Sequence, residues 1–201
     1  SFSEASELAY FGAKVLHPKT ILPAMQKDIP VKVLNSFNPK NKGTTILSKV
    51  SKSSHVVKSI AYKKNITLIN IESSRMLGAF GFLARIFDIF NGYKKSVDAV
   101  ATSEVSVSLT VDDLNGINPI LDELRKIADV KLHENKSLIC VVGEGIKSSM
   151  DIASRTFAAL AKNRIHPEMI SMGASEINIT FIIDGKDTEK AVRLLHEEYF
   201  E

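Results

Sequence analysis

The 201-residue sequence is poor in cysteine and has no tryptophan; Cys140 is its only thiol. A single thiol cannot form a disulfide within the chain or a metal site built from several thiolates. Cys140 lies in the apolar run 138–142. We therefore interpret it as a buried small side chain in a reducing compartment, which fits this run better than a reactive thiol does.

The chain also lacks a large excess of charge, with 26 Lys and Arg against 23 Asp and Glu and a formal net charge of +3. A charge this small does not require a polyanionic partner, so we expect no nucleic acid to bind. No apolar run approaches the roughly 18 residues that a membrane span needs, and no signal peptide opens the chain. We therefore expect a soluble, cytoplasmic protein that makes no membrane contact.

The motifs of common enzyme active sites are missing as well. The sequence contains no glycine-rich P-loop, no GxGxxG, no GxSxG and no HExxH. Its five histidines are scattered without the spacing of metal ligands. We expect no metal site, and no self-contained active site in residues 55–201.

A change in composition near residue 50 divides the chain. Four of the six prolines fall within residues 12–43, and only a helix at about 4–11 and strands at 29–34 and 44–47 are predicted before residue 50. These elements are too few to close a core alone. The chain has no initiator Met and opens on a capped helix start, so we expect residues 1–50 to be the remnant of a larger domain.

Beyond residue 54 the pattern repeats, because residues 101–112 resemble residues 173–184 at an offset of 72 (173 − 101). Each copy reads β-α-β-β-α, with strands at 66–72 and 138–143 and helices that begin near Phe82, Ile117, Ile152 and Thr188. This predicts an α+β fold of ferredoxin-like βαββαβ units. RNA-recognition modules share this pattern, but no aromatic residue lies between Ser96 and Asp112 to stack on bases.

The first copy has a final strand near residues 130–134, whereas the second copy ends with its helix. The spare segment 56–62 precedes the first copy, and we predict that it completes the second sheet rather than pairing with residues 66–72 as a hairpin. One unit would then be inserted in the other. The predicted domains are 1–50, 64–135, and 55–63 with 136–201.

A small-ligand site is predicted where a strand leads into a helix. The glycine-containing loop 73–81 opens the helix at Phe82, whose free N–H groups can hold a carboxylate. The next strand carries Asp98 and Glu104, which could neutralise an ammonium group. An amino acid has both groups. An equally supported interpretation is that the glycines only turn the chain and that Asp98 faces water. In the second copy Ile170 replaces Asp98 (98 + 72), so that unit is not expected to bind an amine.

Several strings in this order and spacing resemble aspartate kinase, specifically its lysine-sensitive, monofunctional type. They are SELAYFGAKVLHP at 6–18, RML at 75–77 with GFLA at 81–84, SVD at 96–98, TSEVSVSLT at 102–110 and GAS at 173–175. The resemblance implies two ACT domains, which sense amino acids, and the last part of an amino-acid-kinase domain that phosphorylates aspartate with ATP and Mg. It implies a regulatory fragment without kinase activity of its own.

The resemblance also implies roles for individual residues. Lys14 and Val15 match positions near the nucleotide phosphates. The pocket for an L-lysine effector, formed between two ACT domains of a homodimer, matches Met76, Ala79, Phe82, Leu83, Val97, Asp98, Thr102, Ser103 and Glu104. Ala79 departs from the family pattern, in which a hydroxyl or amide is common. A stand-alone amino-acid sensor, or threonine as the effector, is the alternative.

Overall fold

The structure is a computed structural model that describes residues 1–13, 16–50, 56–172 and 177–201. The first 50 residues hold α1 (Phe2–Tyr10), α2 (Pro18–Gln26), β1 (Val31–Val33) and β2 (Thr44–Ile46). The remainder holds β3 (Ser59–Glu72), α3 (Phe82–Gly92), β4 (Val100–Thr102), β5 (Ser106–Val111), α4 (Ile117–Arg125), β6 (Asp129–Val142), α5 (Ile152–Lys162), β7 (Met169–Ser171), β8 (Asn178–Asp184) and α6 (Thr188–Phe200).

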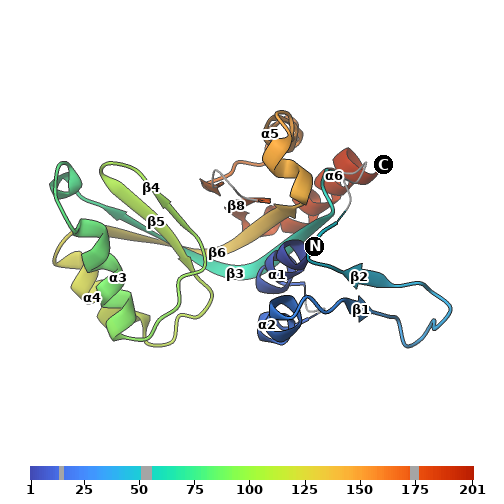
Figure 1. Ribbon diagram of the computed structural model, residues 1–201. Coiled ribbons are helices and arrows are strands. Elements are labelled where there is room, and N and C mark those ends of the chain that lie inside the picture. The colour runs from blue at the N-terminus through green and yellow to red at the C-terminus, as the bar shows by residue number, and fades with distance from the viewer. Residues whose placement is uncertain (14–15, 51–55, 173–176) are drawn as a thin grey trace.

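One antiparallel sheet with the strand order β4-β5-β3-β6-β8-β7 runs through most of the molecule. Its central strands, β3 and β6, are 14 residues long and pair with each other over nearly their whole length. Figure 1 shows α3 and α4 at one end of these long strands and α5 and α6 at the other. The two strands therefore belong to two structural units at once.

Unit 1 comprises the second half of β3, α3, β4, β5, α4 and the first half of β6. Unit 2 comprises the second half of β6, α5, β7, β8, α6 and the first half of β3. In both units the sheet runs in the order second, third, first and fourth strand, which is ferredoxin-like. The predicted fold class is confirmed.

The spare strand behaves as predicted, because residues 59–63 pair with residues 138–142 of unit 2. The alternative hairpin is wrong, since residues 66–72 continue the same strand. One detail differs from the prediction: the strands expected separately at 56–62 and 66–72, and at 130–134 and 138–143, are continuous. The polar segment between the two predicted strands of each pair is a bulge within one strand.

Each long strand carries its bulge where it passes from one unit to the other. The register between β3 and β6 shifts once between Lys63 and Ile66 and shifts again between Ile66 and Leu68. Asn65 and Asn135 lie at these points with φ of 60° and 56°, a left-handed conformation that asparagine tolerates better than most residues. A one-residue bulge reverses which residues face each side of the sheet, so the apolar sides of the two units stay aligned with their helices.

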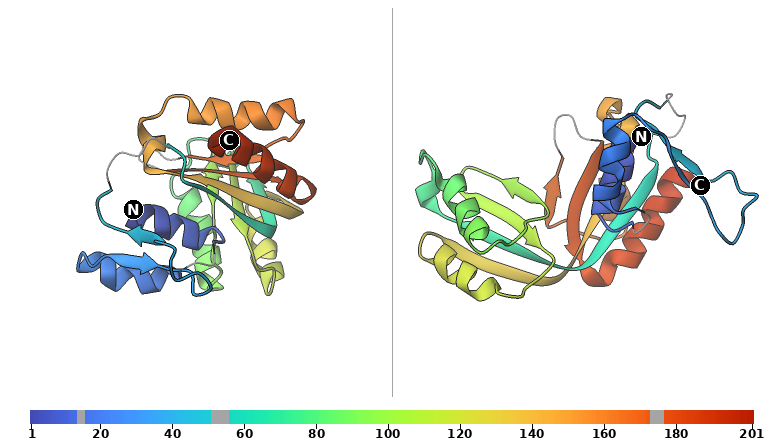
Figure 2. Two further views of the ribbon diagram at one scale, coloured as in Figure 1. Left: turned by 90° about the vertical axis from the view of Figure 1, so that its right-hand side faces the viewer. Right: turned by 60° about the horizontal axis from the view of Figure 1, so that its bottom comes forward.

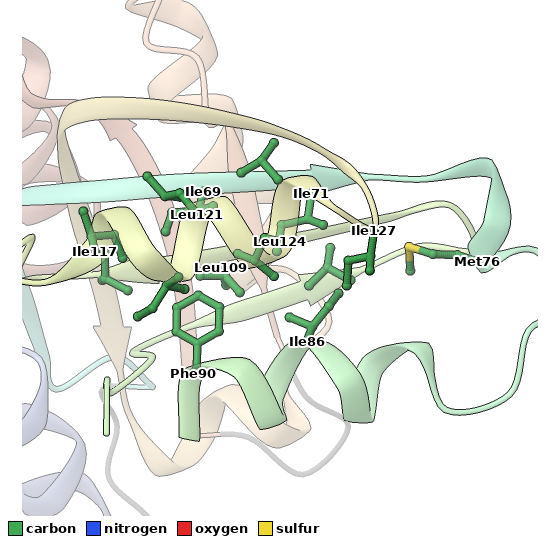
Figure 3. Close-up of a cluster of buried hydrophobic side chains, with 14 residues drawn as sticks. Ile69, Ile71, Met76, Ile86, Phe90, Leu109, Ile117, Leu121, Leu124 and Ile127 are labelled. Atoms are coloured by element: carbon green, nitrogen blue, oxygen red, sulfur yellow. The ribbon is translucent and has the colours of Figure 1, made fainter. Parts of the chain in front are cut away.

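The helices cover the outer face of the sheet and form one core in each unit. In unit 1, Ile86 and Phe90 of α3 pack with Leu121 and Leu124 of α4 over the strands, as Figure 3 shows. In unit 2, α5 and α6 pack over Phe181 and its neighbours in the same way. The apolar positions of all four helices recur at helical spacing, which is why the sequence predicts these helices correctly.

The inner face of the sheet holds a third core that α1 covers. This core contains Leu68, Leu138 and Cys140, and Leu8 and Phe11 at the end of α1 pack against it. Figure 2 shows α1 lying against the long strands. The sheet curves enough for its two edge strands to meet. Ser171 Oγ of β7 donates a 3.3 Å hydrogen bond to the Val100 carbonyl of β4. Cys140 is fully buried, as predicted.

Residues 1–50 form a small group around a separate core of Phe2, Ile21 and Ile46. The predicted helix and both predicted strands are present, and Ser1 and Glu4 make a capping box at the start of α1. The helix α2 was not predicted; it lies in the proline-rich segment and contains Pro23. Pro23 costs the helix one N–H donor, and burial of Ile21 stabilises it nonetheless.

Candidate functional site

The loop that leads into α3 forms an open helix start. Gly81 precedes the helix with a φ of 76° and offers no side chain to bind the first N–H groups. The first turn of α3 contains no acidic residue that could bind them either. These N–H groups and the positive end of the helix dipole can therefore accept an anion such as a carboxylate.

The turn between β4 and β5 lies beside this loop. The Ser73 N–H donates a 2.9 Å hydrogen bond to the Val105 carbonyl, which joins the end of β3 to the turn. Ser103 holds the turn, because its Oγ accepts from the Ser106 N–H at 3.1 Å. Thr102, Ser103 and Glu104 are exposed there. The structure thus places these three predicted residues at the same end of unit 1 as the start of α3.

Four more of the predicted site residues lie in the loop and at the start of α3. Met76 is buried in the unit 1 core, Phe82 is half-buried against it, and Ala79 and Leu83 are exposed. Val97, in contrast, packs on the same core but lies beyond the other end of α3.

Asp98 lies at the opposite end of unit 1, in a cluster of charged groups. Its N–H donates to the Thr110 carbonyl, and its carboxylate is only 8% exposed. Lys63 Nζ lies 3.2 Å from Asp98 Oδ2 and 2.6 Å from Asp112 Oδ2. The Tyr10 hydroxyl donates a 3.4 Å hydrogen bond to Asp98 Oδ1. The cluster therefore joins α1, the junction of the two units, and unit 1.

The pKa values of this cluster follow from burial and from its two negative charges. Burial is the largest influence on Asp98 and raises the pKa of its carboxyl group, although Lys63 opposes the effect. Burial and then the Asp98 charge raise the pKa of Tyr10. Burial lowers the pKa of Lys63, but Asp112 and Asp98 together outweigh it and leave that pKa raised.

The two parts of the predicted site are too far apart to hold one ligand within one chain. Ser73 is bonded to residue 105 and Asp98 to residue 110, which are five positions apart on the same strand (110 − 105). At about 3.3 Å per residue, residues 105 and 110 lie about 16 Å apart along the chain. Asp98 and Glu104 therefore lie at opposite ends of unit 1 within one chain, and the pocket between two chains stays a prediction.

Apolar side chains surround the start of α3. Phe80 is fully exposed, and Leu77 is 64% exposed. Leu83, Phe87 and Val105 are partly exposed around them. We call these five residues the α3 patch. Clusters of exposed apolar side chains of this kind are typical of surfaces that bind another protein.

Asp98 also lines a cleft of about 350 Å³ between α1, β4 and the β7–β8 pair. Asn178 donates a hydrogen bond to Glu7 of α1 in this cleft. Glu4 of α1 accepts a 2.9 Å hydrogen bond from the Glu144 N–H of unit 2. The helix α1 is therefore bonded to unit 2 through its glutamates and to unit 1 through Tyr10.

Some predicted positions have no structural description, and some contacts were not predicted. Lys14 and Val15 lie outside the described residues. Lys63 and Tyr10 were not predicted as partners of Asp98, and no repeat or motif in the sequence indicates them. Ile170, the unit 2 counterpart of Asp98, is half exposed.

The described residues include no group of three or more His, Cys, Asp or Glu side chains that could hold a metal ion. Among these residues, none of the helices combines the length and apolar composition needed to cross a membrane.

Comparisons with known proteins agree with this architecture. A family model described as ACT domain matches residues 139–199. The sequence is 45% identical to Aspartokinase 2, chloroplastic, of Arabidopsis thaliana, covering all of this chain and 39% of that protein. It is 37% identical to the Lysine-sensitive aspartokinase 3 of Escherichia coli, covering all of this chain and 46% of that protein. The chain thus spans less than half the length of these relatives.

Two solved structures resemble the chain over its whole length, and a third resembles most of it. E. coli aspartokinase III in complex with aspartate and ADP (R-state) matches with a TM-score of 0.88 at 37% identity, covering 100% of this chain and 46% of that one. The same enzyme with lysine and aspartate (T-state) matches with a TM-score of 0.83 at 37% identity, covering 100% and 45%. A putative C-terminal regulatory domain of aspartate kinase from Porphyromonas gingivalis, 34% identical, matches with a TM-score of 0.63 over 73% of this chain and 99% of that one.

Proposed function

We propose, because this chain belongs to the aspartokinase family, that it is the regulatory region of an aspartate kinase and binds a free amino acid to control that enzyme. Residues 64–135 form one ACT domain in this proposal. Residues 55–63 with 136–201 form a second, and residues 1–50 are the end of the amino-acid-kinase domain. The strand pairing supports this division, since each unit is completed by half of a shared strand.

The effector in this proposal is L-lysine, bound between the first ACT domains of two chains. The observation that carries it is the separation of the two binding features of unit 1. The open start of α3 can hold the ligand carboxylate, whereas Asp98, at the opposite end of unit 1, can hold an ammonium group. Neither serves one amino acid alone, but two chains related by a twofold axis bring the helix start of one copy to Asp98 of the other.

The α3 patch supports the same arrangement. A second copy placed against unit 1 would cover Phe80 and Leu77, which this chain leaves in water. Glu104, Thr102 and Ser103 would then add acceptors around the ligand. A similar protein was solved in complex with lysine and aspartate, which is why lysine is preferred to threonine here.

Regulation follows if lysine binds one arrangement of the two copies more tightly than another. The ligand then shifts the population toward that arrangement, and the attached kinase domain responds with a coupling free energy of about 1–3 kcal/mol. The helix α1 is suited to this transmission, because it is bonded to both units. Lysine would act as a feedback inhibitor of the enzyme that starts its own synthesis.

The kinase reaction, which transfers a phosphoryl group from ATP to the aspartate β-carboxylate with Mg, belongs in this proposal to the longer enzyme. Lys14 and Val15 would lie near the nucleotide there. The 201 residues correspond in this proposal to less than half of such an enzyme, so we expect no kinase activity from them alone. The cytoplasmic location also remains a prediction, and four of the similar plant proteins are named chloroplastic.

Calorimetric titration of the 201-residue chain with lysine and with threonine tests the proposal. We expect lysine to bind, and Asp98→Ala to weaken its binding at least about tenfold, because a charged hydrogen bond contributes about 1.5–3 kcal/mol. The matched control is Asp122→Ala, which removes an exposed carboxylate on α4. Equal affinity in the Asp98 and Asp122 variants would remove Asp98 from the site, and preference for threonine would contradict the choice of effector.

The oligomeric state provides a second test. Phe80→Ser removes the most exposed apolar side chain of the α3 patch without changing a charge. We expect this substitution to weaken the dimer in sedimentation analysis and to weaken lysine binding with it. Phe37→Ser, at an almost fully exposed position in the β1–β2 connection, is the control that should leave both unchanged. A chain that stays monomeric with and without lysine would rule out the site between two copies.

A further inference from the structure

We infer that Lys63 is an internal competitor for the effector, because its ammonium group occupies the carboxylate of Asp98 that would receive the ligand amine. This inference rests on the proposed function. The contact is specific: Lys63 Nζ lies 3.2 Å from Asp98 Oδ2, and the two side chains are 28% and 8% exposed. A ligand ammonium group that binds Asp98 at Oδ2 must share that oxygen with Lys63 or displace Lys63 from it.

The net charge of the cluster favours this exchange. Lys63 contacts two carboxylates, Asp98 and Asp112, so one positive charge faces two negative charges. A second ammonium group brings the cluster to neutrality, whereas a cluster that was already balanced would have no net charge to attract it. No compensating group has to enter or leave with the ligand.

The two contacts of Lys63 are unequal, which gives the exchange a direction. The distance to Asp112 is 2.6 Å and the distance to Asp98 is 3.2 Å. Lys63 can therefore keep its shorter contact with Asp112 while it gives up Asp98. The affinity for the effector is then the intrinsic affinity of Asp98 reduced by the cost of removing Lys63.

The same exchange reaches α1. Tyr10 donates its hydroxyl to the other oxygen of Asp98 at 3.4 Å, and the Asp98 side chain lines the cleft beneath α1. A ligand amine that draws Asp98 toward itself weakens this bond, which is a polar contact between α1 and unit 1. Lys63 thus sets how much effector is needed before α1 is released from unit 1.

Replacement of Lys63 tests the competition directly. We expect Lys63→Met to tighten lysine binding about fivefold in calorimetry at constant ionic strength, a factor that corresponds to a partly exposed ion pair. Lys63→Gln, which keeps hydrogen-bond donors but no charge, should act in the same way if the methionine variant folds poorly. Lys63→Arg restores the cation and should return the affinity to that of the unsubstituted chain.

Lys64→Met is the matched control. Lys64 is the next residue of β3, but its ammonium group contacts Glu189 of α6 at 3.1 Å and not Asp98. Its loss changes the net charge equally and should leave the affinity for lysine within about twofold.

The outcomes separate the two claims. If the unsubstituted chain binds lysine and both uncharged Lys63 variants bind it equally or more weakly while circular dichroism is unchanged, the competition is refuted and the proposed function stands. An equal gain in the Lys64 variant would also refute it, since the effect would then come from net charge. If neither the unsubstituted chain nor any Lys63 variant binds lysine, the proposed function itself fails, and the inference fails with it.

Discussion

Replacement of Gly12 by alanine should separate α1 from the sheet. Gly12 follows α1 with a φ of +112°, which L residues rarely adopt. A Cβ atom at this position would lie 2.5 Å from the carbonyl oxygen of Tyr62 in β3. The neighbouring atom is backbone and cannot rotate away, so either the end of α1 or strand β3 must move.

The cost can be built from these two effects. A non-glycine residue forced to a positive φ loses about 1–2 kcal/mol, and overpacking of a tight contact costs about 1–3 kcal/mol. We therefore expect Gly12→Ala to lower the free energy of unfolding by about 2–5 kcal/mol, a large part of the roughly 5–15 kcal/mol that stabilises a typical domain. Tyr10, two residues earlier, should lose its contact with Asp98.

Urea unfolding followed by circular dichroism measures this loss, and Gly92→Ala is the matched control. Gly92 is the last residue of α3, has no positive φ, and offers an added Cβ no neighbour within 4 Å. That variant should be as stable as the original chain or gain up to about 1 kcal/mol from helix propensity. A Gly12 variant within about 0.5 kcal/mol of the original chain would show that α1 is not held against β3 in this way.

Three further results are expected. Asn65→Ala should cost about 1 kcal/mol in urea unfolding because its φ is 60°, whereas Asn65→Gly should stay within about 0.5 kcal/mol; equal effects would contradict the account of the bulge. Asp98→Asn should lower the pKa of Tyr10 in an NMR titration, because the Asp98 charge adds to burial in raising it. Since that pKa is raised on folding, Tyr10 contributes stability below about pH 10 that is lost as the pH rises through its folded value; an unmoved Tyr10 titration would argue against the contact. Cys140 should react with a thiol reagent only after unfolding, and rapid reaction of the native chain would contradict its burial.

The sequence predicts the elements of the two units well because their periodicities are simple. The four helices of units 1 and 2 each show an apolar stripe, and β5 alternates strictly between apolar and hydroxyl side chains. The repeat at 72 residues then indicates that the two units share one topology. The spare strand follows from counting strands in each unit.

Two features of the fold cannot be predicted from the local sequence pattern. The bulges at Asn65 and Asn135 keep β3 and β6 continuous, but the polar residues there have the composition of a loop. The helix α2 contains Pro23, which favours a break, and tertiary packing of Ile21 overrides that preference. In both places contacts between distant segments decide the structure.

Part of the candidate site could likewise be predicted from local sequence, and part could not. The open start of α3 could be predicted, because a glycine-containing loop followed by an apolar helical stripe is a local signal. The position of Asp98 could not, since its distance from that helix depends on the direction of β4 across the sheet. Its partners Lys63 and Tyr10 are 35 and 88 positions away in the chain. No spacing rule connects residues so far apart.

The side-by-side course of β3 and β6 has a practical consequence for engineering. The polypeptide enters unit 1 near residue 65 and leaves it near residue 135, on two strands that are hydrogen-bonded neighbours. A homologous unit could therefore be exchanged at two splice points that lie on adjacent strands. The recipient would keep all the strands that lie outside the exchanged unit. A chimera joined at a single point in the primary structure would instead leave each half short of a strand, and it should aggregate rather than fold.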